Sequence, residues 1–330
     1  MEKLMISNTP HVRASSSTKR IMIDVAIALL PALVMGIVYF GLKALLVTAI
    51  AVVASIGSEV CYRLINKEDF KDILRSFDFT SLVTGLILGM NLSPDVQWYV
   101  PLIGGVFAIV VVKMLFGGTG KNFFNPAIAA RVFLLISFAS AMTTWADPNV
   151  APINPSSVES GATVLGSVIG GSAAMSNLDL FLGTGVASGA FGETCKVALI
   201  VGGIYLVIRG VIDWKYPIIY VVTTGLMTVL LNLDFSVFLP SILSGGLIFG
   251  AIFMATDYVT TPNTTLGNII YFVALGLLTA VLRHLKGSEV VSYCIILMNC
   301  FVPLIDRFIV PKPFGYVKPK KEGKKEGANG

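Results

Sequence analysis

Long apolar stretches separated by short polar connections make up most of the chain. About 20 apolar residues cross a bilayer as a helix, so each stretch is read as one span. The stretches lie at residues 21–40, 42–62, 79–93, 98–116, 123–143, 195–213, 216–233, 236–256, 267–285 and 289–310. This pattern predicts an all-α polytopic membrane protein of about ten transmembrane helices.

The stretches form two groups of five around one long polar connection. The predicted organisation is a terminal segment (1–20), a first five-helix half (21–143), the connection (144–194), a second five-helix half (195–310) and a tail (311–330).

Internal repetition is visible in two competing registers. TGL at 84–86 matches TGL at 224–226, which implies parallel repeats. LILG at 86–89 matches LIVG at 199–202, which implies inverted repeats. The sequence leaves both registers open.

The composition supports the membrane class and removes several alternatives. Of the 330 residues, 55% are hydrophobic and 13% are charged, whereas soluble domains carry about 25% charged residues. The run 21–40 has no small-residue cleavage site after it, so it is interpreted as the first span and not as a removed leader. The four cysteines form no CxxC, which argues against a disulfide framework or a self-contained iron–sulfur site.

Basic residues predict the orientation in the membrane. They occur before the first span, after the second span and in the tail 311–330, and none occurs in the connection 144–194. The positive-inside rule places both termini in the cytoplasm and residues 144–194 on the outer side of the cell membrane. The Lys-, Gly- and Pro-rich tail is expected to be disordered.

Two polar stretches on the predicted cytoplasmic side are candidates for a binding pocket. GGTGKNFFNPAIAAR (117–131) offers free N–H groups at a helix start, although it does not match a phosphate-binding P-loop. FMATDYVTTPNTTLGN (253–268) concentrates short polar side chains at a membrane boundary. Helix capping explains some of these residues, but two polar loops at one face would also form a pocket.

A lone threonine in the connection, Thr163 of SGAT, raises a separate question. A nucleophilic threonine needs a base, and the only histidines, His11 and His284, are distant in sequence. A self-activating hydrolase is therefore disfavoured. The alternative is that Thr163 accepts a covalent group from another enzyme.

Charged residues inside the predicted spans are few. They include Asp24, Lys113 and Arg131, with Glu193 at the outer start of the sixth span, and Asp24 and Lys113 are interpreted as snorkelling to the nearby boundary. With no carboxylate at the centre of a span, the principal ion site is expected at an interface with other membrane subunits.

Four landmarks in order carry a resemblance to a known family: GGTGKNFFNPA (117–127), SGAT (160–163), GAFGET (189–194) and ATDYVTTP (255–262). The chain resembles the family that contains the D subunits of Rnf ion-translocating ferredoxin:NAD oxidoreductase complexes. It resembles more distantly the B subunits of sodium-translocating NADH:quinone reductases.

The resemblance implies a flavoprotein. It implies that Thr163 carries FMN through a phosphoester made by a flavin transferase, with Ser160, Gly161 and Ala162 completing the anchor motif. It also implies a second, non-covalent flavin, expected to be riboflavin, and two halves of opposite orientation. The candidates to hold this second flavin are Asn122, Phe123, Phe124, Asn125, Asp257 and Thr260, with stacking from Phe123 or Phe124.

The expected function is a subunit of an ion-translocating oxidoreductase, active only within its complex. It would relay electrons between ferredoxin and NAD while the complex moves Na⁺ or H⁺. The implied partners are the other membrane and peripheral Rnf subunits, a second FMN-carrying subunit among them, and the lipid membrane. We expect no metal site, no nucleic acid and no catalytic residue in this chain. The alternatives are a ten-helix solute channel or transporter of urea-channel-like fold and a purely structural anchor.

Overall fold

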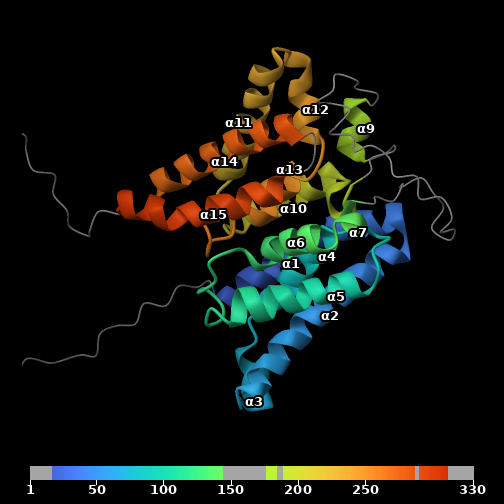
Figure 1. Ribbon diagram of the computed structural model, residues 1–330, viewed down its shortest axis with the longest axis vertical. Coiled ribbons are helices and arrows are strands. Elements are labelled where there is room, and N and C mark those ends of the chain that lie inside the picture. The colour runs from blue at the N-terminus through green and yellow to red at the C-terminus, as the bar shows by residue number, and fades with distance from the viewer. Residues whose placement is uncertain (1–16, 144–175, 184–188, 287–289, 311–330) are drawn as a thin grey trace, which may run out of the picture.

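The computed structural model describes residues 17–143, 176–183, 189–286 and 290–310, and all regular structure in these ranges is helical (Figure 1). The first half contains α1 (Thr18–Phe40), α2 (Leu42–Ile65), α3 (Phe70–Ser76), α4 (Thr80–Met90), α5 (Tyr99–Val106), the π-helix η1 (Phe107–Met114), α6 (Pro126–Ser137) and α7 (Ala139–Thr143). Two short elements follow, α9 (Asn177–Leu182) and the 3₁₀-helix η2 (Phe191–Glu193). The second half contains α10 (Lys196–Ile208), α11 (Lys215–Asn232), the 3₁₀-helix η3 (Phe235–Val237), α12 (Phe238–Leu243), α13 (Leu247–Phe249), the π-helix η4 (Gly250–Met254), α14 (Thr265–Lys286) and α15 (Val291–Phe308).

The helices agree with the predicted all-α membrane class. Among the described residues, four helices (α1, α2, α14 and α15) are long and apolar enough to cross a membrane, or up to six if each of two bent pairs is one span. The bent pairs are α3 with α4, at 70°, and Phe235–Leu243 with Leu247–Met254, at 65°. Shorter apolar helices occupy other predicted stretches, so the number of ten spans stays a prediction.

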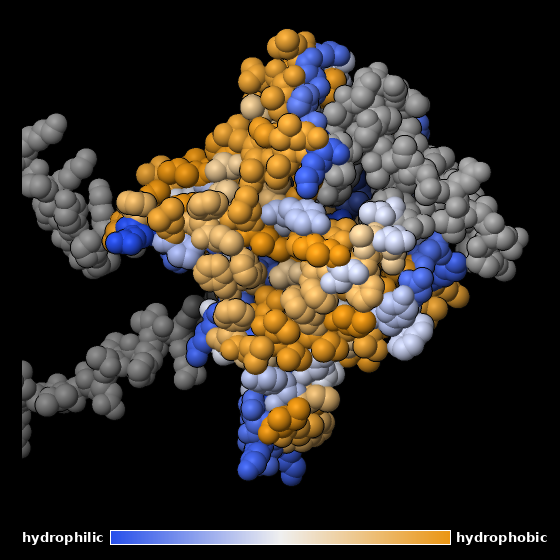
Figure 2. Space-filling model, viewed as in Figure 1, coloured by the Kyte–Doolittle hydropathy of each residue, from blue (hydrophilic) through white to orange (hydrophobic). Residues whose placement is uncertain are grey.

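Large apolar side chains cover much of the outer surface, as the orange areas of Figure 2 show. The apolar side chains of Val53 on α2 and Ile208 on α10 are 70% and 77% exposed. Apolar surface of this extent would be costly in water and is favourable against lipid tails.

The two halves repeat one packing scheme. The second helix of each half packs on the helices that follow it: α2 on α4 and α5, and α11 on α12 and α14. The initial helices α1 and α10 contact each other, and so do the final helices α6 and α15. The bent pair is the third segment in both halves. In this correspondence each helical segment of the first half matches the segment five positions later in the chain. The TGL match would instead pair segments that are four positions apart.

Glycines let the helices of the first half approach closely. A Cβ on Gly85 of α4 would lie 2.6 Å from the Cα atom of Val52 on α2, and a Cβ on Gly89 would lie 2.8 Å from the Cα atom of Thr48. Small residues allow such contacts between membrane helices. Gly85 and Gly89 therefore let α4 pack closely against α2.

Buried cations satisfy backbone carbonyls where helices break. Lys196 donates to the carbonyl oxygens of Glu193 and Gly245, the latter at 3.0 Å, and Arg283 donates to the Ser241 carbonyl at 2.9 Å. The break between α12 and α13 lies inside the apolar stretch 236–256, which the sequence pattern predicts as one unbroken span. Freed carbonyls at membrane depth need such donors, which gives these buried charges a structural role.

Candidate functional site

The glycine-rich loop after η1 turns sharply toward α6. Gly117, Gly118 and Gly120 have φ angles of 103°, 93° and 83°, a region that side-chain-bearing residues rarely adopt. The loop ends at Asn125, which caps α6: its Oδ1 accepts hydrogen bonds from the N–H groups of Ala127 (3.0 Å) and Ile128 (3.4 Å). The capping role suggested by the sequence is therefore present at Asn125.

The second polar loop, residues 255–264, folds on itself. The Asp257 carboxylate accepts from the Val259 N–H (3.2 Å), and the Thr261 hydroxyl donates to the Asp257 carbonyl (3.1 Å). Thr264 caps α14 by accepting from the Gly267 N–H at 3.1 Å. Much of the polarity of this stretch is thus used to fix the loop.

The two loops meet at one cavity of about 100 Å³. Its walls come from α1, α4, η1, the start of α6, the end of α10 and η4. The polar lining residues are Thr80, Thr84, Lys113, Thr119, Asn122, Asn125, Thr256, Asp257 and Tyr258. The apolar remainder includes Ile87, Leu206 and Phe253. A mainly apolar cavity with a few convergent polar groups is the usual form of a small-molecule site.

The structure brings together half of the residues proposed for the second flavin. Asn122, Asn125 and Asp257 line the cavity. Thr260 is buried but is not part of the wall.

Phe123 and Phe124 also lie outside the cavity wall, where they pack edge to face with ring centroids 5.0 Å apart. The aromatic groups in the wall are Phe253 and Tyr258. They come from the other loop and the helix before it, so a flavin in this cavity would not stack on the phenylalanines that the sequence suggested.

The anchor motif lies elsewhere in the chain. Thr163, Ser160, Gly161 and Ala162 fall outside the described residues, as do most of the connection 144–194 and all of the tail 311–330.

Asp257 supplies a carboxyl group to the cavity from the second polar loop. Burial raises its pKa from 3.8 to about 6, and the hydrogen bonds from Val259 and Thr260 offset only part of this effect. A carboxyl in this state is easily neutralised near physiological pH.

Replacing Asp257 with asparagine is expected to change the pH dependence of stability. The folded protein binds this proton more tightly than the unfolded chain, so wild-type stability falls as the pH rises from about 4 to about 6, by about 3 kcal/mol in total. The asparagine keeps the acceptor for Val259 and cannot ionise. The variant should therefore gain unfolding free energy relative to wild type across that window and differ little below it.

Thermal unfolding midpoints of both proteins at a series of pH values measure this difference. Asp234→Asn is the matched control, because hydrogen bonds from Ser236 lower the pKa of Asp234 and its dependence should have the opposite sign. A pH-independent difference between Asp257→Asn and wild type would contradict the prediction.

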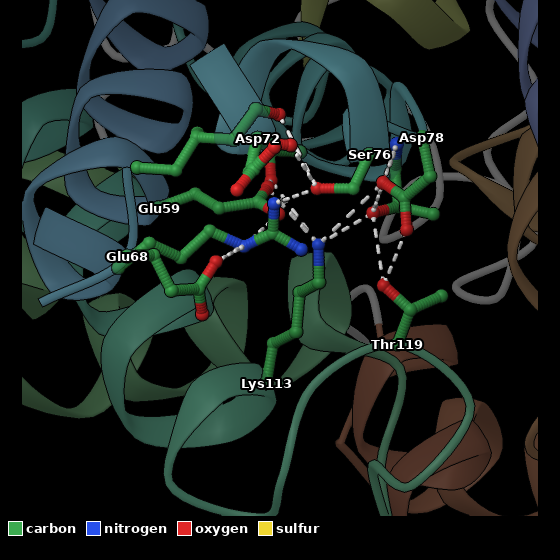
Figure 3. Close-up of polar contacts among 11 residues, drawn as sticks. Glu59, Glu68, Asp72, Ser76, Asp78, Lys113 and Thr119 are labelled. Carbon is green, nitrogen blue, oxygen red and sulfur yellow. Dashed lines mark hydrogen bonds and ion pairs between the residues drawn. The ribbon is translucent and has the colours of Figure 1, made fainter. Parts of the chain in front are cut away.

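The structure corrects the interpretation of Asp24 and Lys113 as snorkelling residues. The Asp24 side chain is buried and accepts hydrogen bonds from Arg209 (3.1 and 3.2 Å) and Tyr205 (3.0 Å). Lys113 is 3% exposed and forms an ion pair at 3.1 Å with Glu59, which is 1% exposed (Figure 3). Both groups turn inward because a partner of opposite charge is present on a neighbouring helix. Glu59 is a buried charge that was not singled out from the sequence, although a carboxylate inside the predicted span 42–62 is itself a signal.

Arg131 and Glu193, the other two charged residues singled out from the sequence, are also buried. Arg131 donates to the Asn91 side chain at 2.5 Å, at the end of α4. Glu193 is expected from the sequence at the outer start of the sixth span, and it is 5% exposed with its carboxylate accepting from the Ala190 N–H at 3.1 Å. Both stabilise interior helix ends.

Comparison with known proteins decides the family. The model of the NQR2, RnfD, RnfE family matches residues 5–315. The chain belongs to this family.

Curated relatives are similar over nearly the whole length. The chain is 41% identical to the D subunit of the Na(+)-translocating ferredoxin:NAD(+) oxidoreductase complex of Acetobacterium woodii, over 97% of this chain and 98% of the relative. It is 37% identical to the D subunit of the proton-translocating ferredoxin:NAD(+) oxidoreductase complex of Clostridium ljungdahlii, over 94% and 96%. It is 35% identical to the D subunit of the ion-translocating oxidoreductase complex of Stutzerimonas stutzeri, over 91% and 93%. The expected family is thereby confirmed.

Proposed function

We propose that the chain is the D subunit of an ion-translocating ferredoxin:NAD oxidoreductase complex in the cell membrane. It would relay electrons through two flavins while the complex moves Na⁺ or H⁺. The family match and the full-length relatives support this assignment. The relatives' names include both ions, so the proposal covers both.

The cavity between the two polar loops is the proposed site of the second flavin. The observation that carries this proposal is that Asn122, Asn125 and Asp257, from two stretches more than 100 residues apart, line one cavity. Asn122 and Asp257 would hydrogen-bond the ring edge or the ribityl chain. The apolar wall with Phe253 would cover the ring faces.

The charges of the cavity favour riboflavin over a phosphorylated flavin. The one lysine in the wall, Lys113, is already paired with Glu59 at 3.1 Å, and Asp257 adds negative charge whenever it is ionised. A phosphate would meet no unpaired cation among the residues that line this cavity. A neutral ribityl alcohol needs only hydrogen-bond partners, which the wall supplies.

The first flavin is the proposed FMN on Thr163. SGAT in a connection without lysine or arginine supports this part, together with membership of the family. A flavin transferase would form the phosphoester on the outer side of the membrane. The other Rnf subunits, including a second FMN-carrying one, would exchange electrons with this chain.

Ten transmembrane helices in two inverted halves complete the proposal. Support comes from the repeated packing scheme, because a shift by five segments, an odd number, reverses the orientation of the second half. Both termini would then lie in the cytoplasm, on the side of the cavity loops.

Flavin analysis of the purified complex tests the function. Denaturation should release riboflavin from this subunit, and the washed polypeptide should keep a second, covalent flavin. Asn122→Leu, which places an apolar side chain in the cavity wall, should lose the released flavin and keep the covalent one. Phe123→Leu, adjacent in sequence but outside the wall, should keep both. A wild-type subunit without releasable flavin would overturn the proposed cavity site.

A further inference from the structure

A continuous series of hydrogen bonds runs from the protein surface to the buried Glu59–Lys113 pair (Figure 3). The Thr119 hydroxyl donates to Asp78 Oδ2 at 2.6 Å, and the Thr80 hydroxyl donates to Asp78 Oδ1 at 2.6 Å. Lys113 Nζ donates to the Thr80 hydroxyl at 2.5 Å and to Glu59 Oε2 at 3.1 Å. Each link joins a donor to an acceptor that can pass on a proton.

The two ends of this series lie in different surroundings. Thr119 is exposed and the Asp78 side chain is 19% exposed, whereas the Lys113 and Glu59 side chains are 3% and 1% exposed. Thr119, Thr80 and Lys113 all line the cavity between the two polar loops. The series therefore connects solvent to the cavity wall along the N-terminal end of α4.

A second branch leads from Glu59 to the surface near α3. Arg63 approaches Glu59 Oε1 at 3.8 Å and donates to the Ser76 hydroxyl at 2.8 Å. It also approaches Glu68 at 3.9 Å, where the carboxylate is 46% exposed. Glu59 thus has charged neighbours on both sides and is not sealed in an apolar pocket.

A purely structural role accounts poorly for this arrangement. A buried ion pair brings little net stability, because the cost of removing two charges from water offsets their attraction. A structural pair also needs no connection to solvent. Here Thr80 and Asp78 extend the pair outward, and Ser81 adds a further hydrogen bond to Glu59.

We propose that Asp78, Thr80, Lys113 and Glu59 form a proton relay between solvent and the cofactor cavity. This proposal rests on the proposed function, in which a flavin in the cavity accepts electrons. A flavin held in the cavity would supply the redox chemistry, and its reduction would need a proton at the cavity wall. The relay itself carries no electrons.

One proton enters for each proton delivered. Lys113, whose ammonium lines the cavity, would give up one N–H proton to a group held there and become a neutral amine. The Thr80 hydroxyl, which donates to Asp78 in the resting arrangement, would turn to give its proton to this amine and take another from the Asp78 carboxyl, protonated beforehand from solvent. Glu59 holds Lys113 in place and stabilises its charged form before and after the transfer.

The test uses the whole purified complex with its natural electron donor, reduced ferredoxin. Rapid mixing in weakly buffered detergent solution follows flavin reduction by absorbance and proton uptake by a pH-indicator dye in the same sample. Thr80→Val, which keeps the shape and removes the hydroxyl, should slow proton uptake about 100-fold, the low end of what a positioned acid or base contributes. Thr80→Ser restores the hydroxyl and should behave like wild type.

Asp78→Asn gives an independent readout at the solvent end. It should also slow proton uptake, and a small weak acid such as formic acid should restore the rate by delivering protons to Thr80 directly. Lys43→Met, which breaks the surface ion pair with Asp95 away from the relay, should leave proton uptake unchanged.

Two results would overturn the relay. One is proton uptake at the wild-type rate in both Thr80→Val and Asp78→Asn with the cavity flavin still bound. The other is loss of that flavin from Thr80→Val together with no rescue of Asp78→Asn by weak acid, which would mean a binding role. A wild-type complex without releasable flavin would instead refute the proposed cavity site, and the relay with it.

Discussion

Thr163→Ala is expected to abolish covalent flavin in this subunit completely, because it removes the hydroxyl oxygen that would form the phosphoester. Ser160 is the only other hydroxyl of the SGAT motif, and it lies three residues away. After denaturing electrophoresis, the wild-type band should fluoresce under ultraviolet light and the variant band should be dark. The mass of the peptide that contains residue 163 should fall by the mass of the bound flavin phosphate as well as by that of the side-chain change.

The matched control is Ser157→Ala, a hydroxyl removed from the same connection outside SGAT. Its band should fluoresce like wild type. The Thr163→Ala subunit should also still release riboflavin on denaturation, because the cavity lies among helices far from residue 163 in sequence. A fluorescent Thr163→Ala band would contradict the assignment of the anchor.

The position of the cavity could be predicted from sequence because local polarity is unusual at a membrane boundary. The stretches 117–131 and 253–268 both combine polar side chains with a helix start. Parity of the predicted spans puts them on one side, and the structure places Asn122 and Asp257 in one wall. The aromatic residues of the wall could not be predicted in this way. Phe123 and Phe253 both lie in the two polar stretches, and only the folded loops show that Phe253 lines the cavity and Phe123 does not.

The ion pair between residues far apart in the chain could not be predicted from the sequence either. Lys113 and Glu59 are 54 residues apart, and the contact depends on how α2, α4 and η1 pack. Without that packing, a lysine near a boundary is reasonably assigned to snorkelling. The break between α12 and α13 escapes prediction for a similar reason, because the stretch 236–256 is apolar throughout and the donors that compensate the break, Lys196 and Arg283, come from other helices.

The helix contacts favour one of the two repeat registers that the sequence leaves open. The TGL match at 84–86 and 224–226 would pair α4 with α11. The contacts instead match α2 with α11, and the bent pair of the first half with the bent pair of the second. Short matches of Gly, Leu and Thr recur easily in membrane helices, whereas a set of helix contacts is a stronger criterion.

Lys113→Met is expected to destabilise the subunit by about 3 kcal/mol, the low end for breaking a buried ion pair, because the buried Glu59 carboxylate keeps only the more distant Arg63, at 3.8 Å, as a cation. The double variant Glu59→Gln with Lys113→Met should recover most of this loss, since the glutamine is neutral and can still accept from Ser81. Lys43→Met, at an ion pair whose side chains are 47% and 23% exposed, should cost no more than about 1 kcal/mol.

Unfolding midpoints of the purified complex, followed by loss of the monodisperse peak in size-exclusion chromatography, measure these differences. Equal losses in Lys113→Met and Lys43→Met would contradict a buried pair. The double variant also separates the two roles of the pair. It restores the neutral interior but has no group to replace the Lys113 ammonium, so it should regain stability while proton uptake at the cavity stays slow.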